Sequence, residues 1–384
     1  MPSLKNKKLL VFTGGGLAPA LNPTLYGVIK EAQGKGMQIF GGLFGWACLL
    51  DNGRVVDLTH FNPEPLKNIG GTALRSSRTN PLGVKDGLEI VREKLREYKV
   101  DFVVAIGGDD TLGAAHKLFQ QEKIKIVGVP KTIDNDLPAT YWTPGFPSAA
   151  YCTAKFCEEI KIDAAYALSR IFIIEVLGRK SGWLAAAAAY GAADVIIPPE
   201  KKVKLSKVLD ILAQRYEKNG NFATLVISEE TNFDQEVKGI SQDQKDSFKV
   251  KRKSFVALGL KEKIKESLGI DCKPLFPGNF LQTGRPIETD AYWARRLGEK
   301  AIQLISQDKF GYMAALSRPG RSLKISAVEV PLAKAVGRVR LLDRSYFDFE
   351  NFKVKQKFFH YMEPMLGRPK SETGAYLKFI RKIP

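Results

Sequence analysis

Histidine, cysteine and long apolar runs are scarce in this chain of 384 residues. The three histidines, His60, His116 and His360, stand far apart, and none forms a helical pair around a glutamate. The four cysteines are irregularly spaced. This composition argues against a zinc hydrolase, a disulfide framework and a paired metal-ligand cluster, and it predicts a reducing, cytoplasmic location.

No segment has the length and apolar character of a membrane span or a signal peptide. The basic start is followed by an apolar run, from Leu9 to Phe12, that is too short for the core of a signal peptide. The longest run of small apolar residues, Leu184 to Ala189, predicts a buried helix. The sequence therefore predicts no membrane partner.

Positive charge dominates, with a formal net charge of +18 from 59 lysines and arginines against 41 aspartates and glutamates. Such an excess is compatible with nucleic acid, a membrane surface or polyanionic small substrates. Many lysines, however, fall in polar segments such as residues 201–207 and 245–253, without a regular pattern of aromatic residues. We interpret most of this charge as solvated surface and expect no specific nucleic acid.

Strand, turn and helix patterns alternate along the first part of the chain. Residues 8–13 form an apolar run that ends in three glycines and leads into an expected helix at residues 22–33. The pattern returns as a strand at 102–106 and a helix at 112–120, and a third strand is expected at 124–129. This alternation predicts a mostly parallel α/β sheet with helices on both faces, which binds ligands beyond the carboxyl ends of its strands.

A second α/β pattern begins after Pro147, with strands expected at residues 170–176, 194–197 and 223–228. The polar stretch at 231–249 is expected to be a long loop or mobile insertion.

The chain length calls for two domains. We expect two doubly wound, Rossmann-like α/β lobes with mostly parallel sheets and a cleft between them. The first would comprise residues 1–145 plus about 281–331, and the second about 146–280 plus 332–384.

Glycines 14–16 follow the first expected strand, where bare backbone amides can approach a phosphate.

Two motifs place carboxylates directly after expected strands. The segment Gly107-Gly-Asp-Asp-Thr111 puts Asp109 and Asp110 where a strand meets a helix start, which suits Mg²⁺ bound to phosphate oxygens, although the same residues could merely cap the helix.

The second motif is Pro130-Lys-Thr-Ile-Asp-Asn-Asp136, which sets Lys131 and Thr132 beside two carboxylates. In an extended segment, Asp134 and Asp136 would face the same way. One carboxylate can accept the proton of an attacking hydroxyl while the other holds metal, and Lys131 can neutralise phosphate charge.

These two motifs resemble the signature pair of the phosphofructokinase family. Further similar segments follow the family's order, namely Thr13-Gly-Gly-Gly with Ala18, Pro19 and Asn22, then Gly70-Gly-Thr-Ala-Leu-Arg-Ser-Ser-Arg78, and Leu177-Gly-Arg-Lys-Ser-Gly182. The similarity extends from about Leu9 to Gly298. It implies a glycolytic transferase that uses Mg²⁺ and acts on fructose 6-phosphate, with a donor-binding first lobe and a sugar-phosphate-binding second lobe.

The resemblance also implies a role for each matching residue. Asp134 would deprotonate the 1-hydroxyl of the sugar, and Asp109 would bind Mg²⁺. Arg170 would reach the substrate of a neighbouring subunit, which implies a homodimer or homotetramer with sites completed across subunits. The implied catalytic residues are Asp134, Thr132, Asp136 and Arg179. The implied donor-binding residues are Gly15, Gly16, Arg78, Gly108, Asp110, Thr111 and Lys131. The implied sugar-phosphate-binding residues are Thr132, Asp134, Arg170, Leu177, Gly178, Arg179, Glu229, Lys273, Asn279 and Gln282.

The positions of Asp110 and Lys131 bear on the phosphoryl donor, because relatives that use ATP typically carry glycine at both. A side chain at Asp110 would intrude on the α-phosphate of a nucleotide and repel it. Lys131 could bind the terminal phosphate of pyrophosphate. Both residues match the pyrophosphate-dependent branch of the family, with ATP as the alternative donor.

Lys273, Asn279 and Gln282 stand where basic or imidazole side chains are usual in the family. Without the fork geometry of arginine there, another sugar phosphate such as sedoheptulose 7-phosphate stays open. A hypothesis of another class is a non-catalytic nucleic-acid-binding or regulatory protein that kept the fold. The clustered charges of the site argue against it, because a decayed site has no reason to retain them.

Overall fold

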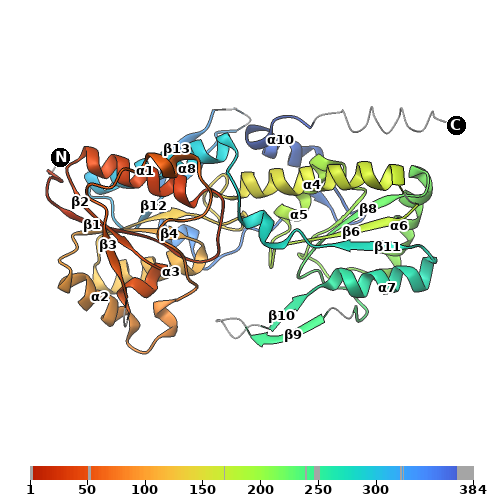
Figure 1. The fold of residues 1–384 in the computed structure, drawn as a ribbon, viewed down its shortest axis with the longest axis horizontal. Helices are drawn as coiled ribbons and strands as arrows, with labels where there is room; N and C mark the ends of the chain where they lie inside the picture. Colours follow the sequence, from red (N-terminus) through yellow and green to blue (C-terminus); the bar gives the residue numbers. More distant parts are fainter. Residues whose placement is uncertain are drawn as a thin grey trace. The chain divides into compact units, whose positions relative to one another are not determined.

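The computed structural model describes residues 3–50, 53–167, 169–237, 240–245, 251–320, 322 and 324–369 (Figure 1). The chain forms two compact units. Unit 1 comprises the chain up to Ile133, Leu137–Ser148 and Gln282–Val339, whereas unit 2 comprises Asp134–Asp136, Ala149–Leu281 and the chain from Arg340. Residues 332–339, which we expected in the second lobe, thus lie in unit 1.

Unit 1 is built on a seven-stranded sheet in the order β13-β12-β5-β4-β1-β2-β3. The inner strands are parallel, and the two edge strands run antiparallel to their neighbours. Strand order reverses direction between β1 and β4, as in a doubly wound sheet. The strands are β1 (Lys8–Thr13), β2 (Gln38–Gly42), β3 (Val55–Asp57), β4 (Phe102–Gly107), β5 (Ile126–Pro130), β12 (Tyr312–Ser317) and β13 (Ser326–Pro331).

Helices cover both faces of this sheet, with α1 (Leu21–Gly34) and α8 (Glu288–Ser306) on one side and α2 (Gly87–Glu97) and α3 (Asp109–Glu122) on the other (Figure 1). The central strands are therefore buried on both faces rather than alternating, with β4 buried at every position and β1 at every position after Lys8. Helices α1 and α8 approach so closely that a Cβ on Gly27 would lie 2.1 Å from the Arg295 carbonyl oxygen.

Unit 2 contains a four-stranded sheet in the order β11-β6-β8-β7, and all of its pairs are parallel. Both sheets confirm the prediction of a mostly parallel α/β architecture. The strands are β6 (Ile171–Val176), β7 (Val195–Ile197), β8 (Ala223–Ser228) and β11 (Cys272–Leu275). The helices are α4 (Phe146–Ala167), α5 (Trp183–Ala187), α6 (Leu205–Asn219), α7 (Val256–Leu268) and α10 (Gln356–Leu366). The first residues of α4 belong to unit 1.

Short elements complete the described chain. They are the 3₁₀ turns η1 (Gly45–Leu49), η2 (Glu64–Asn68), η3 (Pro81–Gly83), η4 (Ala188–Gly191) and η5 (Gly278–Gln282), the helix α9 (Leu332–Ala335), and the paired strands β14 (Phe347–Asp348) and β15 (Lys353–Val354).

An antiparallel ribbon of β9 (Ile240–Lys245) and β10 (Lys251–Ser254) occurs in unit 2. The expectation of a loop at residues 231–249 is therefore wrong at β9, whereas residues 246–250 lie outside the described residues. The polar composition of β9 concealed it, because a strand without an apolar face leaves no period in the sequence. The ribbon leads into Phe255, whose N–H donates to the buried Glu175 at 3.0 Å.

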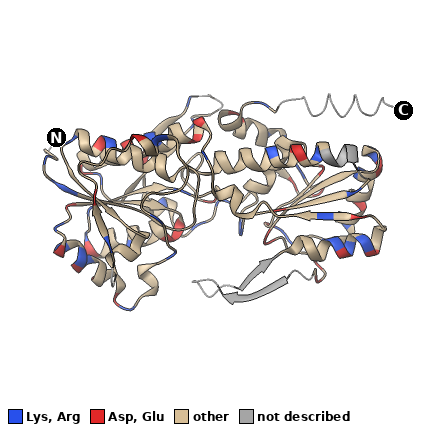
Figure 2. Ribbon diagram, in the orientation of Figure 1, with Lys and Arg blue, Asp and Glu red and all other residues tan. Residues whose placement is uncertain are grey.

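Charged side chains of both signs are mixed along the exposed faces of α2 and α7 (Figure 2). Arg92 on α2 forms ion pairs with Glu89, Glu93 and Glu122, and Lys263 on α7 pairs with Glu266. Positive charge thus forms no single-sign face on these two helices. Along the described part of the chain, every helix is too short or too polar to cross a membrane.

Candidate active site

Loops that follow three neighbouring strands of unit 1 meet at one edge of its sheet. Because β1, β4 and β5 are parallel, their carboxyl ends share that edge. The Gly14 amide donates to the Ile106 carbonyl at 2.8 Å, and the Lys131 amide donates to the Gly107 carbonyl at 2.9 Å. We call residues 14–16, 70–78, 107–111 and 131 the phosphate loops, after the role that the sequence predicts for them.

The Lys131 side chain reaches the first glycine turn of the phosphate loops, and Lys131 is only 3% exposed. Its Nζ donates to the Gly16 carbonyl at 2.5 Å, and a Cβ on Gly15 would lie 3.4 Å from that nitrogen. The absence of side chains on the glycines therefore leaves room for the ammonium group. A buried ammonium favours hydrogen-bond acceptors and negative charge beside it, and phosphate oxygens supply both.

The Gly15 amide is already used inside the protein, which differs from the expected contact with phosphate. It donates to the Ser77 carbonyl at 2.8 Å, while Ser76 Oγ donates to the Gly15 carbonyl at 2.7 Å. These bonds join the first glycine turn to the 70–78 loop, whose last residue is the half-buried Arg78. Among the described residues the Gly16 amide has no hydrogen-bond acceptor, so it is the amide of this turn that can face an anion.

Thr111 packs between two of the phosphate loops. Its side chain is so close to their glycines that a Cβ on Gly107 would lie 2.4 Å from Thr111 Cβ, and one on Gly14 would lie 2.6 Å from its Oγ1. Its carbonyl accepts a hydrogen bond from Trp46 Nε1 at 3.2 Å. Thr111 is 4% exposed, so its side chain spaces the loops.

Asp109 and Asp110 are the first two residues of α3, directly after its N-cap Gly108. Negative side chains interact favourably with the positive end of the helix, but they would repel a bare phosphate. Asp109 Oδ1 accepts a hydrogen bond from the Gly337 amide at 2.7 Å. In the described parts of the chain no three histidine, cysteine, aspartate or glutamate side chains form a metal cage. The carboxylates of Asp109 and Asp110 fit Mg²⁺, which commonly takes one or two carboxylates and completes its shell with phosphate oxygens and water.

The segment that carries Asp134 and Asp136 is kinked, so the expectation of an extended backbone is wrong. Asn135 between them is fully buried and adopts a left-handed conformation with φ of 54°. Asparagine tolerates this region better than most residues. Alternation of faces does not continue through such a residue, and the two carboxylates cannot be placed on one face by counting.

Contacts within unit 2 hold this kink at residues 134–136, which we call the catalytic turn after the role that the sequence predicts for it. Arg340 Nε and Nη2 donate to the Asn135 carbonyl at 2.8 and 2.7 Å. The Arg340 amide donates to the Asp136 carbonyl at 2.6 Å. Ser181 Oγ donates to the Asp134 carbonyl at 3.3 Å. Arg340 was not predictable from the sequence, because it lies 205 positions from Asn135 and belongs to no local motif.

Turns after β6 and β8 bring together Leu177, Gly178, Arg179 and Glu229. The Glu229 amide donates to the Val176 carbonyl at 2.9 Å, which ties the two turns. Gly178 has φ of 133°, and a Cβ there would lie 2.9 Å from the Ser181 carbonyl oxygen, so this turn requires glycine. Ser181 follows in the same turn and contacts Asp134, which places this cluster beside the catalytic turn.

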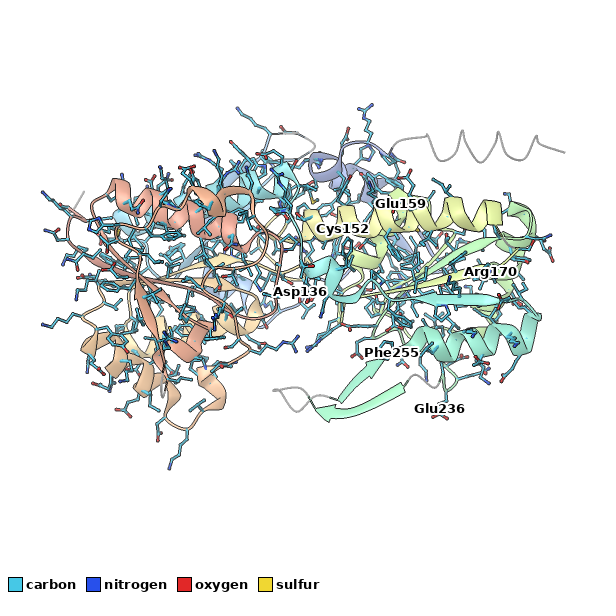
Figure 3. All side chains as sticks on the ribbon, viewed as in Figure 1. Asp136, Cys152, Glu159, Arg170, Glu236 and Phe255 are labelled. Carbon is cyan, nitrogen blue, oxygen red and sulfur yellow. The ribbon has the colours of Figure 1, made fainter. Side chains whose placement is uncertain are left out.

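The other expected sugar-phosphate residues lie elsewhere. Arg170 precedes β6, whereas Arg179 follows it, so a strand length of roughly 20 Å separates the two. Lys273 pairs with Phe172 near the same amino end, where Arg170 forms an ion pair with Asp271 at 3.3 Å. Figure 3 likewise places Arg170 and Asp136 at well-separated positions within unit 2.

Asn279 and Gln282 fall in different units although both belong to η5. Asn279 is exposed in unit 2. Gln282 belongs to unit 1, and its Nε2 lies 3.7 Å from the position that a Cβ on Gly16 would occupy. Gln282 thus lies beside the first glycine turn of the phosphate loops.

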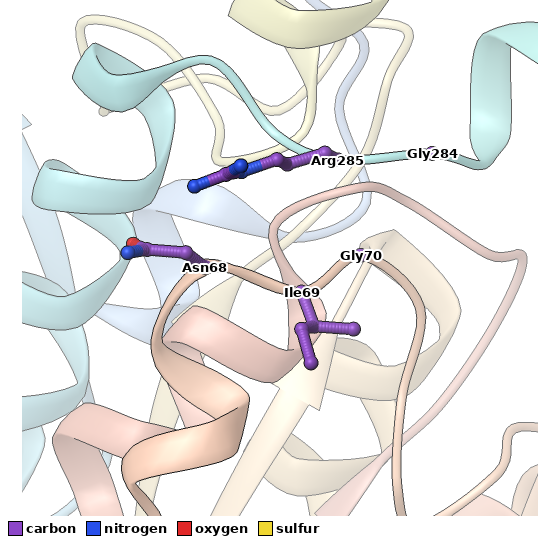
Figure 4. Close-up of a pocket in the computed structure, with 5 residues that line it drawn as sticks. All are labelled: Asn68, Ile69, Gly70, Gly284 and Arg285. Atoms are coloured by element: carbon purple, nitrogen blue, oxygen red, sulfur yellow. The ribbon is translucent and has the colours of Figure 1, made fainter.

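A pocket of about 530 Å³ adjoins the 70–78 loop of unit 1. Its lining residues are Asn68, Ile69, Gly70, Gly284 and Arg285. The side chains of Asn68 and Arg285 extend in the same direction, and Ile69 points away from them (Figure 4). The lining thus includes Gly70 of the phosphate loops and none of the residues of the catalytic turn.

Comparisons with known proteins agree with the motifs. The family model described as phosphofructokinase matches residues 8–305. The pyrophosphate–fructose 6-phosphate 1-phosphotransferase of Dictyoglomus thermophilum is 31% identical over 351 residues, which are 90% of this chain and 98% of that one. The ATP-dependent 6-phosphofructokinase 3 of Streptomyces coelicolor is 31% identical over 311 residues, covering 80% and 89% of the two chains.

The fold also matches a solved structure. The crystal structure of a pyrophosphate-dependent phosphofructokinase from Nitrosospira multiformis has a TM-score of 0.83, with 23% sequence identity over 95% of this chain and 93% of that one. At this identity the similarity concerns the fold. The family model and the relative from Dictyoglomus each span most of the chain, and this chain therefore belongs to the phosphofructokinase family.

Proposed function

We propose that this chain transfers a phosphoryl group from pyrophosphate to the 1-hydroxyl of D-fructose 6-phosphate, giving fructose 1,6-bisphosphate and phosphate in a reversible reaction. The observation that carries the donor assignment is the buried Lys131 among the phosphate loops. The relative from Dictyoglomus thermophilum has this activity in its name, which supports the same donor.

The donor would be held by unit 1. Lys131 and the Gly16 amide would bind one end of pyrophosphate, and Arg78 would add charge from the neighbouring loop. Asp110 would exclude the α-phosphate of a nucleotide by bulk and repulsion. Asp109 would hold Mg²⁺, which when bound neutralises negative charge on the phosphate oxygens. In this arrangement Thr111 and Gly108 would shape the loops.

The catalytic turn would supply the base. Asp134 would take the proton of the sugar 1-hydroxyl as its oxygen forms a bond to phosphorus, while the bond to the departing phosphate breaks. Arg179, Thr132 and Asp136 would assist by positioning the reacting groups and by placing charge around the transferring phosphoryl group. The reverse reaction uses the same groups, with Asp134 returning the proton.

The sugar would be held by Leu177, Gly178, Arg179 and Glu229. Asn279 and Gln282 would offer neutral amides where arginine would give a charged fork. Arg170 and Lys273 lie a strand length from this cluster, so we propose that they bind the substrate of a neighbouring subunit in a homodimer or homotetramer. Arg170 and Lys273 of a neighbouring subunit would then add positive charge to a sugar-binding cluster whose one cation is Arg179.

A cytoplasmic location fits the cysteines. All four are free, and burial raises the pKa of the Cys48, Cys157 and Cys272 thiols to about 12. Because the thiolate is the reactive form of cysteine, such thiols react slowly.

The decisive experiment measures fructose 1,6-bisphosphate formation by the purified protein from fructose 6-phosphate and Mg²⁺, with pyrophosphate and ATP supplied separately. We expect turnover with pyrophosphate and at least about 100-fold less with ATP, the ratio that roughly 3 kcal/mol of discrimination gives. Turnover with ATP alone would overturn the donor assignment. Silence with both donors would overturn the sugar assignment, and sedoheptulose 7-phosphate would be the next substrate to test.

A further inference from the structure

We infer that Arg340 is a positioning residue that fixes the catalytic turn and thereby the base Asp134. The inference rests on the proposed function, because it assigns Arg340 a part in that reaction. It adds a residue from the carboxyl-terminal part of the chain, beyond the range of the family model.

Arg340 holds the catalytic turn through several hydrogen bonds. Its guanidinium donates twice to the Asn135 carbonyl and once to Asn135 Oδ1, and its amide donates to the Asp136 carbonyl. Asn135 Nδ2 donates in turn to the Tyr361 hydroxyl at 2.8 Å. Both ends of the Asn135 side chain and its carbonyl are therefore fixed. These contacts stabilise the left-handed backbone conformation of Asn135, which would otherwise relax.

Arg340 is itself held on an aromatic platform. Trp183 Nε1 donates to the Arg340 carbonyl at 3.2 Å, and the guanidinium carbon lies 5.5 Å from the centre of the Trp183 ring. Trp183 is 2% exposed and packs against Tyr361 and Tyr346 at 4.8 and 5.0 Å between ring centres. Cation–π contact and this packing leave the arginine little freedom to follow a moving turn.

Loss of the guanidinium would leave the buried Asn135 carbonyl without two of its donors. Such a group costs free energy unless the backbone shifts to find water or another donor. A shift of the turn moves Asp134 and Asp136 together, because they are its immediate neighbours. A displacement of about 1 Å in a reacting group can lower a rate about 100-fold, so a small relaxation would suffice.

The test compares Arg340→Ala and Arg340→Lys with Arg338→Ala. Arg338 is exposed two positions away on the same segment and serves as the matched control. We expect Arg340→Ala to lower kcat about 10- to 100-fold and to change KM for fructose 6-phosphate less than about 3-fold. Arg340→Lys should fall between, and Arg338→Ala should match the wild type. Added methylguanidinium should restore part of kcat in Arg340→Ala only.

A readout without turnover separates this inference from the proposed function. In Arg340→Ala, hydrogen–deuterium exchange should become faster for a peptide covering residues 133–137 and for the amide at position 340, which Asp136 protects in the wild type. Unchanged exchange overturns the inference whatever the substrates of the enzyme prove to be. A wild type inactive on every substrate tested, with faster exchange in the variant, would refute the function and keep the positioning role.

Two outcomes of the kinetic test overturn the positioning role. One is an unchanged kcat in Arg340→Ala, and the other is a rise in KM at constant kcat, which would indicate substrate binding instead. If Arg340→Ala fails to fold, Tyr361→Phe replaces it, because that change removes only the hydroxyl that binds Asn135. We then expect a loss of kcat below about 10-fold with the same faster exchange, and unchanged values would again refute the role.

Discussion

Asp134 owes its position to residues far from it in the chain, and its own chemistry can be tested by the smallest change. Asp134→Asn keeps the shape of the side chain but removes the proton acceptor. We expect kcat to fall about 10²- to 10⁴-fold while the affinity for fructose 6-phosphate, measured by calorimetry, changes little. If turnover survives, the base is another group, and Asp136→Asn becomes the comparison.

Lys131 and Asp110 set the donor in the proposed reaction. Replacing both with glycine should lower kcat/KM for pyrophosphate, because a buried ammonium contact is lost, and raise it for ATP, because bulk and repulsion are removed. We expect the ratio of ATP to pyrophosphate use to rise at least about 10-fold, equivalent to 1.4 kcal/mol. Lys131→Gly alone is the control and should impair pyrophosphate use without improving ATP use. An unchanged ratio in the double variant would contradict the donor assignment.

The glycine turns and carboxylates were predictable because each stands next to a strand of its own motif. Asp109 and Lys131 follow buried strands whose parallel arrangement brings their ends together. The left-handed Asn135 was not predictable, because its conformation depends on Arg340 and Tyr361, more than 200 positions away. Local sequence carries no record of such partners, and the expected alternation of the two carboxylates failed for that reason.

At the scale of elements, one buried carboxylate fixes the start of α4 in unit 1. Asp290 of α8 accepts hydrogen bonds from the Gly145 amide at 3.0 Å, the Ser148 amide at 3.2 Å and Ser148 Oγ at 2.5 Å. These are amides at the beginning of a helix, which need acceptors. Burial nevertheless dominates and raises the pKa of Asp290 from its ordinary value of 3.8 to about 6.

The raised pKa gives a signed prediction. Between about pH 4 and pH 6 the native state keeps a proton that the unfolded chain releases, so the contribution of Asp290 to stability falls as the pH rises through this window. Relative to Asp290→Asn, the free energy of unfolding of the wild type should decrease by on the order of 3 kcal/mol from about pH 4 to about pH 7. Urea denaturation at each pH measures this, with the exposed Asp210→Asn as control. A difference that is constant with pH would refute the assignment.

Strands, like site residues, were predictable only where their own sequence carries the signal. The buried strands β1, β4 and β6 are mostly apolar and lead into glycine turns, so they were visible in the sequence. Strand β9 has no apolar pattern, and its pairing with β10 is the only signal that defines it. The placement of residues 332–339 in unit 1 was equally hidden, since it depends on contacts of α9 with α3 and β13.

At the scale of the whole molecule, the role proposed for Arg170 across subunits can be tested by mixing two variants. If Arg170 acts on a neighbouring subunit's substrate, Arg170→Ala and Asp134→Asn should each be inactive as homo-oligomers. Mixed and reassembled, they should regain activity, because one site of a hybrid dimer then has both residues intact. Random mixing of dimers would restore about a quarter of the wild-type rate. Absence of recovery despite verified hybrids would place Arg170 outside the site.

The discontinuous make-up of unit 1 has a consequence for the order in which a growing chain can fold. The sheet of unit 2 needs nothing beyond β11, which ends at Leu275, whereas β5 of unit 1 obtains its outer neighbour β12 only when Tyr312–Ser317 has been made. During synthesis, therefore, β5 presents an unpaired edge to its surroundings after the sheet of unit 2 can already be complete. Proteolysis of ribosome-bound chains ending before Tyr312 should cut the strands of unit 1 faster than those of the unit 2 sheet. The sheet that begins the chain would be the later of the two to finish, and the ribosome or a chaperone would have to guard its open edge in the meantime.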